Sequence, residues 1–193
     1  MPKLMIIVAS TRPGRVGRAI ADWFAHASHQ HGGFDIDVAD LAEIGLPFLD
    51  EPNHPSEHLY VHQHTKDWAA RVDAAHAFVI VMPEYNAGFT APLKNAIDFL
   101  YTEWHYKPVG FVSYGMTSAG LRAVQMIKPV ITAMNLFPVT AAVTIFLRQR
   151  LDETGALHPD AIMTSAAEGM LQELHRIEAA LRPLRESSLI GAA

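Results

Sequence analysis

Short runs of consecutive apolar residues recur along the chain and predict strands that are buried on both faces. Residues 4–9, 78–82 and 108–112 form three such runs, which are typical of central strands in a parallel sheet. Residues 34–40 alternate between apolar and polar side chains, and residues 139–146 do so in part. Alternation predicts a strand with one face in water, so we expect these two segments at or near the edges of the sheet.

Between the predicted strands, apolar residues recur with the spacing of an α-helix. These stripes predict helices that begin near Val16, Thr90 and Gly120, and two more over residues 57–75 and 159–184. Thr90 is also a residue type that caps helices. Strands that alternate with helices imply right-handed crossovers and a parallel sheet. Two edge strands and three central ones fit the order 2-1-3-4-5, which is an α/β, flavodoxin-like three-layer sandwich with a five-stranded parallel sheet.

Length and composition restrict the classes to which the chain can belong. Its 193 residues, half of them hydrophobic, fit one globular domain, which we expect over residues 1–185 with a frayed tail at 186–193. A net charge of −5 argues against a nucleic-acid partner, which calls for a basic face. We expect no membrane segment, because no apolar run approaches ~20 residues, and no signal peptide. The sequence has no cysteine, which excludes disulfides and thiolate chemistry and fits a cytoplasmic protein.

The segment after the first apolar run has the composition of an anion-binding turn. Residues 10–18 lead from a strand into a helix, whose free N–H groups and dipole favour an anion. Ser10 can donate a hydroxyl hydrogen bond and Arg12 a charge-assisted one, whereas Val16 and Gly17 offer only backbone N–H groups. The pattern is neither a Walker A loop nor GxGxxG. Taken alone, it is also compatible with a solvated basic turn.

A second candidate loop follows the apolar run at 78–82. Pro83 ends that strand because proline has no N–H to donate to a sheet, and Glu84, Tyr85 and Asn86 come next. In an open parallel sheet, ligands bind at the carboxyl ends of the strands, where the strand order reverses. Because the loops after the first and third strands flank that point, we expect both candidate loops to converge on one crevice.

The second loop and the helix after it carry a family resemblance. The sequence PEYN at 83–86, followed by LKNAID at 93–98, resembles the hallmark of the NADPH-dependent FMN reductase family. The resemblance implies a flavodoxin-like fold, non-covalent FMN, and NADPH or NADH as the hydride donor. It also implies a small-molecule electron acceptor, since the family includes flavin, quinone, azo-dye and chromate reductases.

The resemblance further implies roles for individual residues. Ser10 and Arg12 would hold the FMN phosphate, the backbone of residues 84–86 would follow the flavin ring, and Tyr85 would shape the ring pocket. The loop after the fourth strand would pass beside the ring, although it is also compatible with a flexible connection. We expect no catalytic side chain, because the sequence shows no serine elbow or triad and flavin N5 would carry the chemistry. The expected cofactor-binding residues are Ser10, Arg12, Val16, Gly17, Pro83, Glu84, Tyr85, Asn86, Ser113, Tyr114 and Gly115.

Three other functions are compatible with this fold class. A flavodoxin-type electron carrier shares the fold, but such carriers are typically markedly acidic and lack arginines like those of the first loop. A phospho-receiver domain needs an aspartate at the end of its third strand, where this sequence has Pro83. An interaction protein without flavin would not account for the paired loops.

A histidine-rich segment, residues 54–64, is a further motif. His58 and His62 are four residues apart and would share a face of the helix predicted from residue 57, as metal ligands can. The segment lacks cysteine and HExxH, so we expect no metal site and interpret it as a surface or subunit contact. Relatives of this kind commonly form homodimers or homotetramers, and the other candidate contacts are Phe89, Trp104 and Tyr106.

Overall fold

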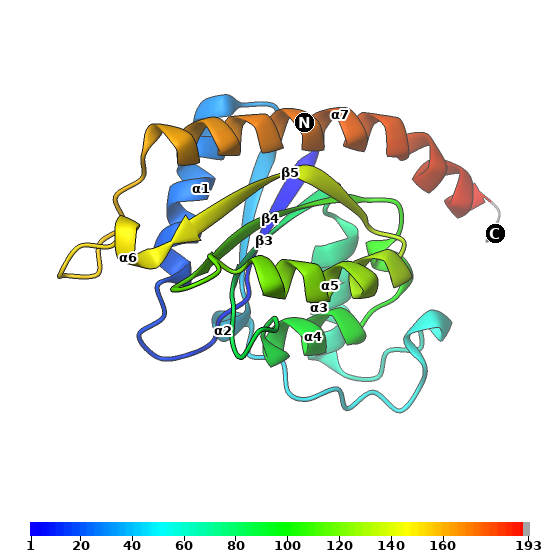
Figure 1. Cartoon of the computed structure of the whole chain (residues 1–193). Helices are drawn as coiled ribbons and strands as arrows, with labels where there is room; N and C mark the ends of the chain where they lie inside the picture. The colour runs from blue at the N-terminus through cyan, green and yellow to red at the C-terminus, as the bar shows by residue number, and fades with distance from the viewer. Residues whose placement is uncertain (191–193) are drawn as a thin grey trace.

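Five parallel strands form one central sheet, in the order predicted from the apolar pattern. In this computed structural model, which describes residues 1–190, the order is β2-β1-β3-β4-β5 (Figure 1). Every neighbouring pair is parallel, so the predicted fold class and topology are confirmed. The strands are β1 (Lys3–Val8), β2 (Asp35–Asp40), β3 (Ala77–Pro83), β4 (Pro108–Gly115) and β5 (Phe137–Phe146).

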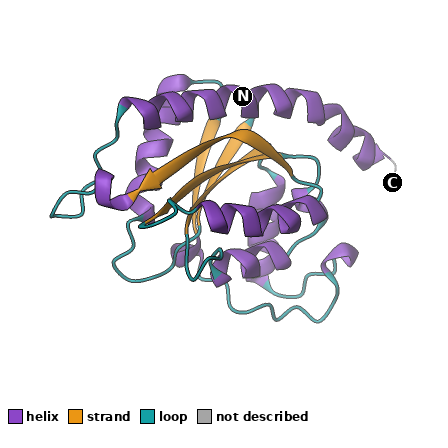
Figure 2. Cartoon of the chain, in the orientation of Figure 1, coloured by secondary structure: helices purple, strands orange, loops and turns teal. Residues whose placement is uncertain are grey.

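Helices cover both faces of the sheet and complete a three-layer sandwich (Figure 2). One face packs against α1 (Gly17–His31) and α7 (Ala161–Ile190), and the other against α3 (Gln63–Asp73), α4 (Ala91–Asp98) and α5 (Leu121–Ala133). Among residues 1–190, no helix is both long enough and apolar enough to cross a membrane. The short elements are the helices α2 (Leu41–Ile44) and α6 (Leu147–Arg150) and the 3-10 turns η1 (Pro55–Glu57) and η2 (Thr102–Trp104).

The two faces of the sheet bury separate cores, because successive side chains of a strand point to opposite sides. In β1, Leu4 and Ile6 belong to the core under α1 and α7, whereas Met5 and Ile7 belong to the core under α3, α4 and α5. All four side chains are buried. The strand is therefore buried on both faces, as its apolar run predicts.

The helix predicted over residues 57–75 is shorter, because α3 begins only at Gln63. The turn η1 is followed by His58, whose φ of 56° is left-handed and cannot continue a right-handed helix. The Glu51 carboxylate then accepts hydrogen bonds from the N–H groups of His62 and of the residue before it. The prediction that His58 and His62 share a helix face is therefore wrong.

Trp104, which we expected at a subunit contact, belongs to the core of the monomer. Its side chain is 2% exposed, and its ring lies 6.0 Å from that of Trp68 and 5.0 Å from that of Phe78, centroid to centroid. The indole N–H donates to the carbonyl oxygen of Ile97 over 3.2 Å. The sequence shows that an aromatic residue is present, but not which side of its 3-10 turn faces inward.

The last helix is longer than its apolar stripe predicts. We expected an end near Leu184, but α7 continues to Ile190. Residues 191–193 of the predicted frayed tail lie outside the described residues, so fraying there stays a prediction. The assignment of residues 1–185 to one domain likewise stays a prediction.

Candidate active site

Three loops meet at the carboxyl edge of the sheet, because β1, β3 and β4 are neighbours there. We call residues 9–16 loop 1, residues 84–90 loop 2 and residues 116–120 loop 3; they follow β1, β3 and β4 respectively. The strand order reverses between β1 and β3, and open α/β sheets bind their ligands at that point. Loops 1 and 2 are the two that the sequence singles out.

Two hydrogen bonds join loop 1 to loop 2. The hydroxyl oxygens of Ser10 and Tyr85 lie 2.9 Å apart, and the Thr90 hydroxyl donates to the carbonyl oxygen of Ala9 over 2.7 Å. Thr90 occupies the N-cap position of α4, as predicted, but its side chain does not cap the helix. Its hydroxyl fixes loop 1 instead.

The start of α1 is open to an anion. Val16 is the N-cap residue and makes no side-chain capping bond, and the first turn contains no acidic residue. The first N–H groups of a helix need acceptors from outside it, and the dipole favours a negative charge there. Val16 and Gly17 can therefore contribute backbone N–H groups, as the sequence predicts.

The arginines of loop 1 and of the first turn of α1 differ in their partners. Arg15 pairs with Asp40 over 2.8 Å, and Arg18 pairs with Asp22, Glu43 and Asp40. Arg12 is exposed and forms no ion pair with residues 1–190. Of the three, Arg12 is thus the cation that is free to meet an anion at the α1 start, and its contact with the FMN phosphate stays a prediction.

Loop 2 folds as a tight turn with two residues in left-handed conformations. Tyr85 and Gly88 exchange two backbone hydrogen bonds of 3.0 Å, and Asn86 and Ala87 between them have φ values of 51° and 65°. Such a turn is costly for a non-glycine residue such as Ala87. The N–H groups of Glu84 and Tyr85 are bonded within the protein, whereas that of Asn86 has no partner among the described residues.

The carboxylate of Glu84 binds loop 3 and the first turn of α5. It accepts hydrogen bonds from the Ser118 hydroxyl, from the Arg122 side chain and from the Arg122 N–H over 3.1 Å. Burial alone would raise the pKa of Glu84, but these hydrogen bonds outweigh burial and lower it. The sequence prediction missed this link. The sequence indicates only that a buried carboxylate needs a hydrogen-bond or charge partner. It does not identify Ser118 and Arg122 as the partners.

Residues 113–115, predicted to begin a loop, are the last residues of β4. Pairing with the end of β3 and with β5 extends the strand to this point. The Ser113 hydroxyl is buried and donates to the carbonyl oxygen of Ala119 over 2.8 Å, so it stabilises loop 3. Gly120 has a φ of 84°, and a Cβ atom there would lie 2.7 Å from that of Ser113. Loop 3 therefore packs directly against the end of β4.

Tyr114, predicted as a ring contact, points to the start of α1. Its side chain is 3% exposed, and its hydroxyl has no hydrogen-bond partner in the described part of the chain. A Cβ atom added at Gly17 would lie 2.4 Å from that hydroxyl oxygen. Burial raises the pKa of Tyr114, so the phenol is protonated at neutral pH.

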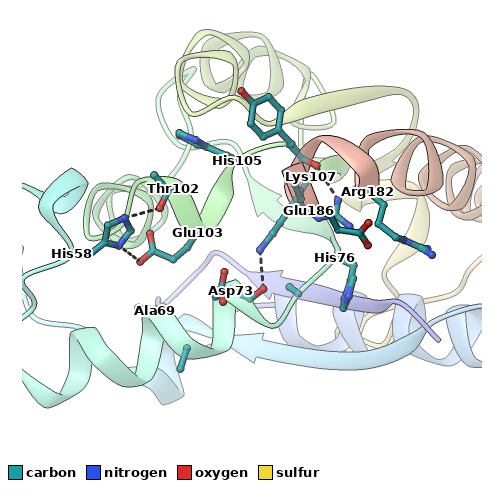
Figure 3. Close-up of a pocket in the computed structure, with 14 residues that line it drawn as sticks. His58, Ala69, Asp73, His76, Thr102, Glu103, His105, Lys107, Arg182 and Glu186 are labelled. Atoms are coloured by element: carbon teal, nitrogen blue, oxygen red, sulfur yellow. Dashed lines mark hydrogen bonds and ion pairs between the residues drawn. The ribbon is translucent and has the colours of Figure 1, made fainter. Parts of the chain in front are cut away.

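Among the cavities formed by residues 1–190, two lie on different sides of the molecule. One, of about 430 Å³, opens between loop 1, the segment after β2 and the start of α4. Figure 3 shows the other, of about 790 Å³, where His58 binds Thr102 and Lys107 binds the end of α3. The strands β3 and β4 begin beside this second cavity, so it lies across the sheet from loops 1 to 3. No group of three or more histidine or acidic side chains within residues 1–190 is placed to hold a metal.

A comparison with protein families decides the affiliation of the chain. The sequence model for NADPH-dependent FMN reductase matches residues 2–147. The chain belongs to this family. The match spans β1 to β5 and loops 1 to 3, so every expected site residue lies within it.

Individual NADPH-dependent FMN reductase relatives agree with this affiliation. An NAD(P)H-dependent FMN reductase of Schizosaccharomyces pombe is 39% identical over 127 residues, which are 65% of this chain and 64% of that protein. An FMN-dependent NADPH-azoreductase of Staphylococcus haemolyticus is 32% identical over 111 residues, 57% of this chain and 58% of that protein. The chain thus matches less than two thirds of the length of either relative.

Solved structures agree on the fold. FerB, a flavoenzyme NAD(P)H:(acceptor) oxidoreductase from Paracoccus denitrificans, superimposes with a TM-score of 0.73, covering 93% of this chain and 98% of that one. The sequence identity of this pair is 15%, so the likeness shows a shared flavodoxin-like architecture and nothing about substrates.

Proposed function

We propose that this protein is an FMN-dependent oxidoreductase that takes a hydride from NADPH or NADH and passes electrons to a second small molecule. The observation that carries the proposal is the meeting of three features at the strand-order reversal. These are the uncapped start of α1, the unpaired Arg12, and the Ser10 hydroxyl 2.9 Å from that of Tyr85. Membership of the NADPH-dependent FMN reductase family supports the choice of cofactor.

The residues of the site fit the phosphate end of FMN. Its phosphate brings negative charge and several acceptor oxygens, which suit a helix start, an arginine and a serine hydroxyl. When bound, FMN would supply the hydride-accepting and electron-donating chemistry at N5. Non-covalent binding is consistent with the absence of cysteine.

The chain contributes binding and orientation. Ser10, Arg12 and the N–H groups of Val16 and Gly17 would hold the phosphate, and the backbone of loop 2 would lie beside the flavin ring. Pro83 ends β3 at the site, and Glu84 fixes loop 2 to loop 3 through its carboxylate. Tyr85, whose side chain is 40% exposed, and Asn86, whose N–H is unbonded, are the groups of loop 2 that can meet the ring. Gly115 brings the backbone of β4 to the same edge.

The electron acceptor belongs to the small molecules reduced by this family: a flavin, a quinone, an azo compound or a metal oxyanion. The names of the two relatives, an FMN reductase and an azoreductase, support the first and third of these. Loop 2 leaves the Tyr85 side chain at the surface, where a second planar molecule can approach the ring.

We further propose a cytoplasmic homodimer. Phe48 is 83% exposed and lies on the rim of the 430 Å³ cavity beside loop 1, and such an exposed aromatic side chain is typical of interfaces. Sedimentation velocity at micromolar concentration is expected to give a dimer, and Phe48→Asp is expected to shift it toward monomer. A wild-type monomer at these concentrations would contradict the proposal.

The proposed activity is tested by titrating cofactor-stripped protein with FMN and then adding NADPH without oxygen. We expect saturable quenching of flavin fluorescence, followed by loss of the oxidised flavin absorbance band. Binding without reduction by NADPH or NADH would favour a flavodoxin-type electron carrier. If the protein did not bind FMN at all, the proposed function would be wrong.

A further inference from the structure

The Tyr114 hydroxyl is a buried polar group without a partner. Only 3% of the residue is exposed, and the hydroxyl forms no hydrogen bond with residues 1–190. Buried polar groups in folded proteins are nearly always hydrogen-bonded, because leaving one unpaired costs free energy. A buried hydroxyl without a partner therefore indicates that a ligand outside the chain accepts its hydrogen bond.

The first residue of α1 packs directly against this hydroxyl. Gly17 is the first residue of α1, and any side chain there would place its Cβ atom 2.4 Å from the Tyr114 oxygen and 3.3 Å from the ring carbon that carries it. Two atoms 2.4 Å apart would overlap, so only glycine at position 17 leaves room for the Tyr114 hydroxyl in this position. Tyr114 thus reaches from β4 to the helix start at which an anion would bind.

The Tyr114 hydroxyl is a donor that lies beside the start of α1, near the hydroxyls of Ser10 and Tyr85. Burial, with a smaller contribution from Tyr85, raises the pKa of Tyr114, and the opposing contributions of Ser10, Arg12 and Arg15 do not cancel this rise, so the phenol keeps its proton at neutral pH. The helix start beside it carries no capping side chain and no acid in its first turn. The unpaired Arg12 adds positive charge. The Ser10 hydroxyl is already hydrogen-bonded to that of Tyr85, so an acceptor-rich anion at the start of α1 is the group that would pair with the Tyr114 hydroxyl.

We propose that Tyr114 donates a hydrogen bond to the phosphate of bound FMN and so sets the preference for FMN over flavin that lacks a phosphate. The inference rests on the proposed function, because it takes FMN as the ligand of loops 1 to 3. It places Tyr114 at the phosphate end of the site, away from the ring contact expected from the sequence. Tyr114 is thus a specificity-determining residue.

The test compares FMN and riboflavin, which share the ring and differ in the phosphate, on cofactor-stripped wild-type and Tyr114→Phe protein. We expect the substitution to weaken FMN binding about tenfold, as for the loss of one hydrogen bond to a charged group. Riboflavin binding should stay within about twofold of the wild-type value, since the ring contacts are kept. Tyr101→Phe, which removes a hydroxyl near the opposite edge of the sheet, is the matched control and should change neither affinity.

Melting temperatures without ligand give a second measurement. An unpartnered hydroxyl contributes no hydrogen bond to the folded state, so we expect Tyr114→Phe to melt at or above the wild-type temperature. Equal losses of FMN and riboflavin affinity, an unchanged ratio of the two, or a lower melting temperature would each overturn the assignment of Tyr114. Those outcomes leave the proposed function standing, whereas a wild-type protein that binds no FMN would overturn both.

Discussion

At the scale of single residues, Glu84 connects two of the three loops of the site. Its side chain is 6% exposed, and it pairs with the guanidinium of Arg122, which is 58% exposed. A buried carboxylate is costly unless its charge is compensated, and Ser118 and Arg122 supply that compensation. The same interactions hold loop 2 in position relative to loop 3.

We predict that Arg122→Ala destabilises the protein by about 1–2 kcal/mol, less than for a fully buried pair because water reaches the arginine. The folded pKa of Glu84 is depressed, so its contribution is present above the unfolded value of 4.5 and is lost as the pH falls through the folded value. The difference between variant and wild type should therefore be full at neutral pH and shrink in acid. Urea denaturation at several pH values measures it.

Arg148→Ala is the control for this prediction. Arg148 is exposed and forms no ion pair with the described residues, so its removal should change stability by less than about 0.5 kcal/mol. Equal effects of Arg122→Ala and Arg148→Ala would show that the Glu84 pair does not stabilise the loops.

At the scale of helices and strands, the sequence was enough to predict the sheet but not the ends of its strands. A parallel strand buried on both faces must be apolar throughout, so the runs at 4–9 and 78–82 indicate the centre of the sheet directly. Successive side chains point to opposite faces only as far as the strand stays paired with its neighbours in the sheet, and the sequence does not show where that pairing ends. Because β4 continues to Gly115, Ser113 and Tyr114 face opposite sides, which composition alone does not reveal.

Loop connections were the other part that the sequence could not predict. The bonds from Glu84 to Ser118 and from Thr90 to Ala9 join residues that are far apart in the chain, and no periodicity relates them. The start of α3 at Gln63 likewise depends on the distant Glu51 carboxylate. Tertiary contacts of this kind override local helix propensity.

Lys107 joins the end of one helix to the start of a strand. It precedes β4, and its ammonium donates to the carbonyl oxygens of Val72 and Asp73 at the end of α3 over 2.9 and 3.0 Å. The residue is 4% exposed. Burial lowers the pKa of Lys107 from 10.5 to about 8, with a smaller lowering by Arg185 and opposing contributions from Asp73 and Glu103.

This shift predicts a rise in stability at alkaline pH. Below the folded pKa of about 8 the cost of burying the charge is present in full, and it disappears as the pH rises above the unfolded value of 10.5, where the lysine becomes neutral in both states. Relative to Lys107→Met, the wild type should gain up to about 3 kcal/mol across that interval. Denaturation of both proteins at neutral and alkaline pH measures the gain, and a difference that does not change with pH would contradict it.

At the scale of the whole molecule, the carboxyl and amino edges of the sheet carry different features. Loops 1 to 3 and the candidate site lie at the carboxyl edge, whereas the 790 Å³ cavity and Lys107 lie at the amino edge (Figure 3). Lys107, whose titration we expect to change stability in alkali, is therefore remote from the residues that we expect to bind FMN. Substitutions at the amino edge can be used to vary stability without touching the site.

Helix α7 covers one face of the finished sheet, and its residues Met170 and Leu174 lie in the same core as strand residues of β1, β3, β4 and β5. A ribosome makes this helix after all five strands. At about 5–20 residues per second, the 30 residues of α7 take roughly 2–6 s to synthesise. For that time the part of this face formed by β4 and β5 lacks its covering helix, because α1 packs against β1, β2 and β3. We therefore expect slower translation of α7 to increase aggregation of the nascent chain.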